Sequence, residues 1–298
     1  MKCKYCDGKG VLNELCKGHF IEYFESKVYG CIDKYNLVPE GSKILVGVSG
    51  GKDSITILYL LNKRYKNVTA YTVDEGISGY RDKTLEDAKT FCQRYNIPMI
   101  IESVEDNFGF RLDEAVPNTR KKPCNICGIM RRYLLNKHKE YDILATGHNM
   151  DDEIQSILMN IMKNQIELLA RLGPKPGIIN SDNFLPRVKP LYFCSEKEVM
   201  TYSYLMGFKM SFIECPFAKL SFRAEIRDTI NGYENKFNGT KKNIIDNFID
   251  MLPRLREVYS EESLTPLREC IECGEPSAKE LCHACSLKKE FRPLILIQ

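Results

Sequence analysis

Residues 47–54 read G-V-S-G-G-K-D-S and follow an apolar run, so this stretch is a candidate phosphate-binding loop. Free N–H groups at a helix start, hydroxyls and an ammonium group are common phosphate ligands. A Walker A loop ending at Gly51 and Lys52 would need glycine at 46 and a hydroxyl at 53, whereas the chain has Val46 and Asp53. We therefore expect a nucleotide loop that does not cleave between the β and γ phosphates, rather than an ordinary glycine turn. The residues expected to hold pyrophosphate are Ser49, Gly50, Gly51 and Ser54, with Lys52 adding charge.

A second polar stretch, A-T-G-H-N-M-D-D-E at residues 145–153, follows another apolar run. Gly147 would let the backbone approach a nucleotide closely, because glycine has no Cβ. Asp151 and Asp152 fall at the start of a predicted helix, where carboxylates can hold Mg²⁺, orient a substrate or cap the helix, and these roles can coexist. We interpret His148 as a packed turn residue and assign it no part in the chemistry.

Three cysteines in the middle of the chain form a third candidate site. Cys124 and Cys127 lie in P-C-N-I-C-G-I-M-R-R at residues 123–132, and Cys215 lies in E-C-P-F after an apolar segment. The first two do not belong to a zinc knuckle, and Cys215 is a candidate ligand that could reach the same crevice. The cysteines that sit in apolar patterns are expected in the core, namely Cys31, Cys92 and Cys194.

Each end of the chain carries a set of metal-type ligands with paired spacing. The first set reads C-K-Y-C, nine residues, C-K-G-H, and the last reads C-I-E-C, eight residues, C-H-A-C. Two such turns complete four ligands without an open position, which is typical of structural zinc. Disulfides are the alternative, but a chain without a signal peptide favours metal. The expected ligands are Cys3, Cys6, Cys16 and His19 at one end and Cys270, Cys273, Cys282 and Cys285 at the other, with His283 as a less favoured substitute.

The elements that must position these residues alternate along the chain. Continuous apolar runs, typical of buried parallel strands, occur at residues 43–48, 68–76, 98–104 and 142–149. Helical spacing occurs at residues 20–38, 54–65, 81–96 and 127–141. We therefore predict an α/β fold, a doubly wound parallel sheet with N- and C-terminal zinc-binding modules. Ligands of such sheets collect beyond the carboxyl ends of the strands, so the polar turns should converge on one crevice.

The S-G-G-K-D-S loop resembles the PP-loop of the ATP pyrophosphatase family, whose members cleave ATP between the α and β phosphates and adenylate a substrate. The 145–153 stretch is similar to the motif after the fourth strand in PP-loop tRNA-modifying enzymes. With the terminal ligand sets and the three central cysteines, nearly the whole chain resembles the TtuA and NcsA group of tRNA 2-thiolation enzymes. The resemblance implies a tRNA sulfurtransferase whose ATP site comprises Ser49, Gly50, Gly51, Lys52, Asp53, Ser54, Val73, Gly147 and Asp152.

The same resemblance implies a [4Fe-4S] cluster on Cys124, Cys127 and Cys215, beside two Zn²⁺ and ATP with Mg²⁺. Three thiolates would leave one iron without a protein ligand, open to a sulfur atom. ATP would adenylate the C2 carbonyl of a uridine, and sulfur would replace the oxygen as AMP leaves. In a cluster-free alternative, Cys124 or Cys127 would be a persulfide nucleophile and Cys215 its resolving partner. The expected catalytic residues are Lys52, Asp53, Cys124, Cys127, Cys215 and Asp151.

Other functions stay open at this point. A 2-thiocytidine synthetase would share the loop, and a zinc-stabilised RNA-binding scaffold would share the metal modules, although the complete loop argues against the scaffold. Within uridine thiolation, the wobble uridine is slightly preferred over the T-loop uridine. The sequence does not distinguish sulfide from a thiocarboxylated ubiquitin-like protein as sulfur donor, or three irons from four.

The 298-residue chain has a net charge of +3 and a pI near 8.1, which is compatible with a tRNA partner without establishing one. Its longest apolar run, ITILYLL, is too short to cross a bilayer, so we expect a soluble, cytoplasmic protein. The resemblance suggests a homodimer, with the C-terminal PLILIQ at the subunit interface. Basic residues near the proposed chemistry are Arg120, Lys121, Lys122, Arg131, Arg132, Arg187 and Lys189. The expected domains are a zinc module at 1–24, a PP-loop domain at 25–218, a helical extension at 219–264 and a zinc module at 265–298.

Overall fold

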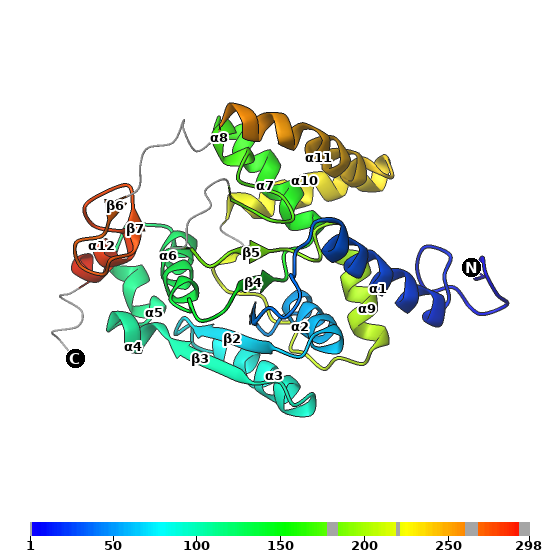
Figure 1. Ribbon diagram of the computed structural model, residues 1–298, viewed down its shortest axis with the longest axis horizontal. Helices are drawn as coiled ribbons and strands as arrows, with labels where there is room; N and C mark the ends of the chain where they lie inside the picture. Colours follow the sequence, from blue (N-terminus) through cyan, green and yellow to red (C-terminus); the bar gives the residue numbers. More distant parts are fainter. Residues whose placement is uncertain (1, 178–183, 219–220, 260–267, 292–298) are drawn as a thin grey trace.

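The computed structural model describes residues 2–177, 184–218, 221–259 and 268–291. At its centre is a five-stranded parallel sheet with the order β3-β2-β1-β4-β5 (Figure 1). The strands are β1 (Ile44–Gly47), β2 (Val68–Asp74), β3 (Met99–Ser103), β4 (Ile143–Thr146) and β5 (Arg187–Val188). The predicted doubly wound parallel sheet is confirmed.

The strands are apolar along most of their length because both faces of the sheet are covered. In β1, Ile44 and Val46 belong to one hydrophobic core, while Leu45 between them belongs to another. β4 repeats the alternation, with Ile143 in the first core and Leu144 in the second. Successive side chains of a strand point to opposite faces, so two covered faces require a continuous apolar run.

Two groups of helices cover these faces. The first core is shared with α1 (Lys17–Lys34), α2 (Lys52–Arg64), α3 (Arg81–Arg94), α7 (Met150–Met162) and α9 (Glu196–Leu205). The second core is shared with α4 (Val104–Phe108), α5 (Leu112–Ala115), α6 (Pro123–Asn136) and α12 (His283–Glu290), and the 3-10 turn η1 (Val116–Asn118) follows α5. A further layer, α8 (Ile166–Leu169), α10 (Phe222–Lys236) and α11 (Thr240–Val258), packs against α7 (Figure 1).

The strand order places a topological switch point between β1 and β4. The chain runs outward from β1 through β2 to β3, and then returns to β4 on the opposite side of β1. Loops after β1 and β4 therefore diverge at this point and leave a crevice above the carboxyl ends of the strands. The two polar stretches predicted to bind the nucleotide follow these two strands.

Several boundaries differ from the sequence-based prediction. The helix predicted at 20–38 spans Lys17–Lys34, and Asn36 follows it with a φ of +45° that a helix cannot continue. The helix predicted at 127–141 begins earlier, at Pro123, because proline at a first helical position needs no hydrogen bond for its missing N–H. The strand β5 was not predicted, since it has only two residues between two prolines.

The terminal modules lie at opposite ends of the molecule (Figure 1). The first continues from α1 away from the sheet, while the last, with β6 (Arg268–Glu269) and β7 (Pro276–Ser277), lies beside α6. The C-terminal PLILIQ and parts of the two expected C-terminal domains lie outside the described residues. Within the described ranges, no helix is long and apolar enough to span a membrane.

Candidate active site

The turn after β1 is held in shape by its own serines. Ser54 Oγ accepts a hydrogen bond from the backbone N–H of Ser49 at 3.1 Å and donates one to the carbonyl of Gly51 at 2.9 Å. Gly50 has a φ of +86°, and a Cβ there would lie 2.2 Å from the backbone oxygen of Thr84 in α3. The turn therefore requires glycine at this position. Because α2 begins directly afterwards, its free N–H groups face the loop.

Lys52, the first residue of α2, connects the loop to α9. Its Nζ lies 3.0 Å from Asp53 Oδ2 and 2.8 Å from Oε1 of Glu196, the first residue of α9. Burial disfavours the ammonium, but these two carboxylates raise the pKa of Lys52 above its usual value. The lysine is therefore charged at neutral pH and positioned to neutralise an anion on the loop.

The turn after β4 closely approaches the start of α2. A Cβ on Gly147 would lie 2.8 Å from the backbone nitrogen of Ser54. Asn149 then joins the two turns, because its Nδ2 donates to Asp53 Oδ1 at 2.9 Å and its Oδ1 accepts from the N–H of Asp152 at 3.1 Å. Asp152 Oδ2 in turn accepts from the Asn149 N–H at 3.2 Å, which completes a capping box. Asp53 and Asp152 are thereby held beside the loop.

The two neighbouring aspartates of α7 have different surroundings. Burial is the main reason that the pKa of Asp152 rises to about 6; the opposing charge of Arg223 is outweighed, and Asp53 contributes to the rise. Asp151 is buried, accepts the backbone N–H of Glu196 at 2.8 Å and forms an ion pair with Lys241 of α11. Both oxygens of Asp151 therefore bind α9 and α11, whereas Asp152 faces the nucleotide loop.

The three central cysteines come from two segments of the chain. Cys124 and Cys127 lie three residues apart at the start of α6, and such residues share one face of a helix. Cys215 comes from the segment after α9, and the Cys124 sulfur lies 3.9 Å from the carbonyl oxygen of Phe217 in that segment. Burial raises the pKa of Cys215, and Cys124 adds to this rise; Cys215 in turn adds to the rise in the pKa of Cys127 that burial causes. The structure therefore brings the three predicted cysteines to one region.

Their spacing is too wide for a single ion. Within the described ranges, only the two terminal sets bring three or more Cys, His, Asp or Glu ligand atoms within 4.8 Å of one another. The sulfurs of Cys124, Cys127 and Cys215 do not meet that limit. Three thiols that face one region at larger separations fit a multi-iron group, in which each thiolate binds a different iron.

A buried carboxylate and an arginine border this cysteine site. Burial raises the pKa of Cys127 to about 12, and Glu75 adds to the rise while Arg131 opposes it. Arg131 lies one turn further along α6 than Cys127, and its Nε lies 3.4 Å from Glu75 Oε1. Glu75 directly follows β2. The carboxyl end of a third strand therefore contributes to the crevice, as the fold predicts.

His148 lies exposed at the crevice, with its Nδ1 2.9 Å from Thr146 Oγ1. The protein atoms around the ring and four surrounding cations lower the pKa of His148. These cations are Lys189, Arg223, Arg131 and Arg187. The ring is therefore neutral at pH 7. Three of these four cations also pair with carboxylates: Lys189 with Glu153, Arg223 with Asp152 and Arg131 with Glu75.

The N-terminal ligand set has the spacing of a tetrahedral metal site. The Nδ1 of His19 lies 3.2 Å from the Cys3 sulfur and 3.4 Å from the Cys16 sulfur, and the Cys6 and Cys16 sulfurs are 3.7 Å apart. Four ligands 2.0–2.3 Å from one zinc at tetrahedral angles lie about 3.5–3.8 Å apart. The four predicted residues therefore fit a metal ion.

The C-terminal set fits a metal in the same way. The Cys273 and Cys282 sulfurs are 3.7 Å apart, and the Cys282 N–H donates to the Cys270 sulfur at 3.3 Å. The Cys285 N–H donates to the Cys282 sulfur at 3.4 Å. Backbone donors of this kind stabilise thiolate ligands. The four-cysteine group does not include His283, in agreement with the preferred prediction.

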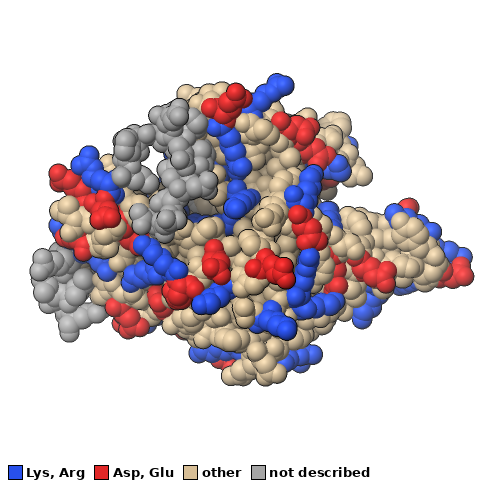
Figure 2. Space-filling model, in the orientation of Figure 1, with Lys and Arg blue, Asp and Glu red and all other residues tan. Residues whose placement is uncertain are grey.

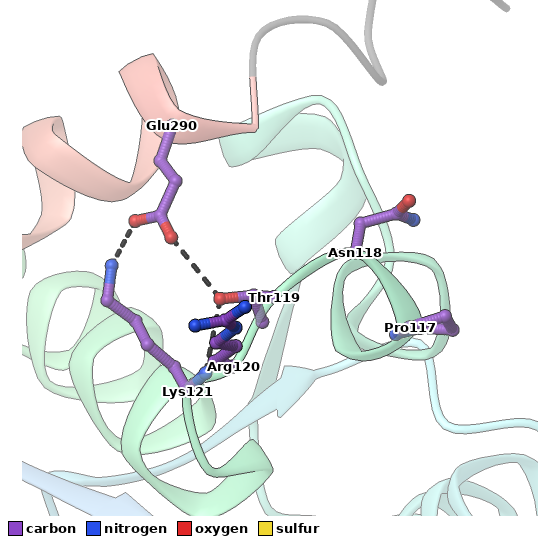
Figure 3. Close-up of a pocket in the computed structure, with 6 residues that line it drawn as sticks. All are labelled: Pro117, Asn118, Thr119, Arg120, Lys121 and Glu290. Atoms are coloured by element: carbon purple, nitrogen blue, oxygen red, sulfur yellow. Dashed lines mark hydrogen bonds and ion pairs between the residues drawn. The ribbon is translucent and has the colours of Figure 1, made fainter.

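The C-terminal module also contacts the segment that precedes the cysteine helix. Figure 3 shows Thr119 and Lys121 pointing toward Glu290 of α12, across a pocket that this segment lines with α12. Thr119 Oγ1 lies 3.3 Å from Glu290 Oε1, and Lys121 forms an ion pair with Glu290. Residues of α12 share the second core with α6. The metal module is therefore packed against the helix that carries Cys124 and Cys127.

Comparisons with known proteins agree with this geometry. Residues 22–231 match the family described as the PP-loop domain. The tRNA-5-methyluridine(54) 2-sulfurtransferase of Pyrococcus horikoshii is 35% identical, over 98% of this chain and 96% of its own. The U34-tRNA thiolase NcsA from Methanococcus maripaludis, solved with its [4Fe-4S] cluster, superposes with a TM-score of 0.82 and 34% identity, over 99% of this chain and 96% of that chain.

The chain belongs to the PP-loop family of tRNA 2-thiolation proteins. A further relative, the tRNA 2-thiolation protein NcsA of Haloferax volcanii, is 29% identical over 96% of this chain and 98% of its own.

Most residues predicted for the ATP site lie together in the structure, but Val73 and the proposed RNA contact Lys189 are buried. The loop residues, Gly147 and Asp152 surround the start of α2. Val73 does not contribute a side chain, because it is buried in the second core. Lys189, proposed to contact RNA, is buried and pairs with Glu153 at 2.6 Å. Cys31, Cys92 and Cys194 are buried in the first core, as predicted.

Sequence reasoning missed several residues of this PP-loop crevice. Asn149 could have been found, because N-M-D-D before an apolar helix has the form of a capping box. Glu196 follows the helix-capping Ser195, which marks a helix start but not its nearness to Lys52. Glu75 lies in the polar end of the stretch predicted as a strand at 68–76, yet nothing in the sequence pairs it with Arg131.

Proposed function

We propose that this protein is an ATP-dependent tRNA sulfurtransferase that converts a uridine to 2-thiouridine. One observation carries the proposal: Arg81 and Glu75 connect Ser49 of the nucleotide loop to Arg131 of α6, the helix that also carries Cys124 and Cys127. The names of the relatives support the substrate class. A nucleotide site beside thiols suits a reaction in which ATP activates an oxygen and sulfur replaces it.

In this proposal the loop acts on ATP. The N–H groups at the start of α2, with Ser49, Gly50, Gly51 and Ser54, hold the pyrophosphate that departs when the uridine C2 oxygen is adenylated. Lys52 neutralises the charge that develops there. Asp53 and Asp152, joined through Asn149, hold the Mg²⁺ that accompanies ATP. Asp151 supports this arrangement through Glu196 and Lys241.

Cys124, Cys127 and Cys215 are proposed to hold a [4Fe-4S] cluster. The donor set fits, since it offers three thiols from a helix start and a neighbouring segment and no fourth thiol among the described residues of the crevice. Such a group supplies an iron without a protein ligand, where a sulfur atom can bind. Arg131 and Glu75 orient the Cys127 side of the site. The terminal ligand sets are proposed to bind one Zn²⁺ each.

The partner is proposed to be tRNA. On the face shown in Figure 2, several Lys and Arg side chains form a short column in the upper middle, and acidic side chains lie below it. Phosphate contacts would use such cations. We prefer the wobble uridine and keep the T-loop uridine as the alternative; relatives are named for each position. A homodimer in the cytoplasm, supplied with sulfide or a thiocarboxylated carrier protein, completes the proposal.

The test is nucleoside mass spectrometry of tRNA incubated with anaerobically purified protein, ATP and sulfide. We expect 2-thiouridine with the wild type, about one cluster and two zincs per chain, and neither cluster nor product with Cys124→Ala. Cys92→Ala is the matched control, because Cys92 is buried in the first core, and it should keep both.

The outcomes separate the alternatives. Thiouridine formed by iron-free protein would assign the three cysteines to persulfide chemistry, and 2-thiocytidine would change the substrate base. Absence of any thionucleoside with cluster-loaded protein would contradict the thiolase assignment. Mass spectrometry of tRNA fragments then distinguishes the wobble position from the T-loop.

A further inference from the structure

A line of charged groups, buried at Arg81 and Glu75 and half exposed at Arg131, runs from the nucleotide loop toward the cysteine site. Arg81 Nη1 donates to the backbone oxygen of Ser49 in the loop at 2.8 Å. The Nε of the same guanidinium lies 3.0 Å from Glu75 Oε2. The other oxygen of Glu75 lies 3.4 Å from Nε of Arg131, which lies one turn beyond Cys127 on α6.

The burial of Arg81 and Glu75 makes this pair depend strongly on each other's charge, while the Arg131 side chain is 47% exposed. The side chain of Arg81 is 3% exposed and that of Glu75 is 8% exposed. Charges that are shielded from water interact more strongly than surface charges, and breaking such a pair is costly. Each arginine faces one oxygen of the same carboxylate. A change in the contact between Glu75 and Arg131 therefore alters how strongly Glu75 attracts Arg81.

We propose that Glu75 is a positioning residue that couples the nucleotide loop to the cysteine site. Through Arg81 it holds the Ser49 carbonyl, and thus the loop; through Arg131 it holds the group beside Cys127. A metal group held beside α6 changes the position of Arg131, one turn beyond Cys127, and with it the pairing of Arg131 with Glu75. The pairing of Glu75 with Arg81 then changes as well, and with it how the loop is held.

The consequence is a linkage between two binding events. If metal ligation at the cysteines changes the affinity for ATP, then ATP changes the metal site by the same free energy. This inference rests on the proposed function, because it assumes that ATP and the cluster share the crevice. It adds that the two sites communicate through one carboxylate.

The test is the Kd for ATP, measured by anaerobic calorimetry without tRNA, on cluster-loaded and cluster-free protein. For the wild type we expect the two values to differ by about fivefold or more, within the usual range of coupling between sites. In Glu75→Gln the ratio should fall to about one. The variant's iron content and thermal midpoint confirm that it folds and loads its cluster.

Two further variants make the experiment decisive. Arg81→Lys keeps a positive charge but lacks the forked donors needed to reach both Ser49 and Glu75. The ratio of its two Kd values for ATP should therefore also fall to about one. Glu102→Gln is the matched control, since the Glu102 carboxylate in β3 pairs with the Tyr71 hydroxyl at 3.0 Å and with His138, outside the line. It should keep the wild-type ratio.

The inference is overturned if the wild-type ratio is one, or if either folded variant at position 75 or 81 keeps the wild-type ratio. Neither result affects the thiolation assay, which uses wild-type protein with tRNA. Conversely, a wild type that shows the ratio but forms no thionucleoside would contradict the proposed function and leave the coupling intact.

Discussion

Asn149 Nδ2 donates a hydrogen bond of 2.9 Å to Asp53 Oδ1, and this bond joins the turns after β4 and β1. The same side chain caps α7 through the Asp152 N–H. One amide therefore sets the position of both carboxylates beside the nucleotide loop.

Substitutions of Asn149 should separate these two roles. Asn149→Ser keeps a helix-capping oxygen but has no amide to reach Asp53, so we expect ATP affinity to fall about tenfold with little loss of stability. Asn149→Ala should lose both, with about 1 kcal/mol less stability. Calorimetry with ATP and thermal unfolding check the pair. Wild-type ATP affinity in Asn149→Ser would contradict the positioning role.

The raised pKa of Asp152 predicts that the charged side chain lowers the stability of the folded protein above about pH 6. Its pKa rises to about 6 in the folded protein, mainly through burial, so the folded state binds this proton more tightly than the unfolded state does. Its contribution to stability is present below the unfolded pKa and is lost as pH rises through 6. Asp152→Asn should therefore have a free energy of unfolding higher than that of wild type at pH 7.5, by on the order of 1 kcal/mol. The difference should disappear near pH 4, and denaturant unfolding at both pH values measures it. A difference independent of pH would contradict this account.

The close approach at Gly147 predicts a steric effect. Gly147→Ala would place a Cβ 2.8 Å from backbone atoms of Asp53 and Ser54, and we expect a loss of about 1–3 kcal/mol in unfolding free energy. Gly30→Ala is the matched control, because a Cβ at this position in α1 has nothing within 4 Å; it should stabilise by up to about 1 kcal/mol. Denaturant unfolding compares the two. Equal effects would show that the turn has room for a side chain.

Loss of the two terminal metals should have unequal effects. Cys285→Ser should remove one zinc and lower both the thermal midpoint and the iron content, since α12 packs on the cysteine helix α6. Cys6→Ser should remove the other zinc with little effect on the iron, because the N-terminal module lies at the far end of α1 (Figure 1). Metal analysis with thermal unfolding measures this. Equal iron loss in both variants would refute the asymmetry.

The phosphate loop and the cysteine knuckles could be predicted from the sequence because each depends on residue types that lie close together in the chain. A carboxylate in place of the Walker hydroxyl at Asp53 excludes one phosphate reaction, and paired cysteine spacing at Cys3 and Cys6 indicates a metal knuckle. The four longer strands were recognisable because burial on both faces demands continuous apolar runs. The two-residue strand β5 was not, since so short a segment leaves no pattern.

Contacts between distant segments were beyond sequence reasoning. Lys52 with Glu196, Asn149 with Asp53 and Glu75 with Arg131 are pairs whose members lie on different elements. Nothing in the local sequence distinguishes Asp152 at the loop from its neighbour Asp151, which binds α9 and α11.

The sequence alone therefore determined which chemical groups this protein carries and the parallel sheet that must present them, because residue type and periodicity are local properties. Only the tertiary structure decided which of those groups meet. Winding the chain around β1 brings the ends of three strands together, and the burial of charges there selects partners far apart in the sequence, since a buried charge must be paired.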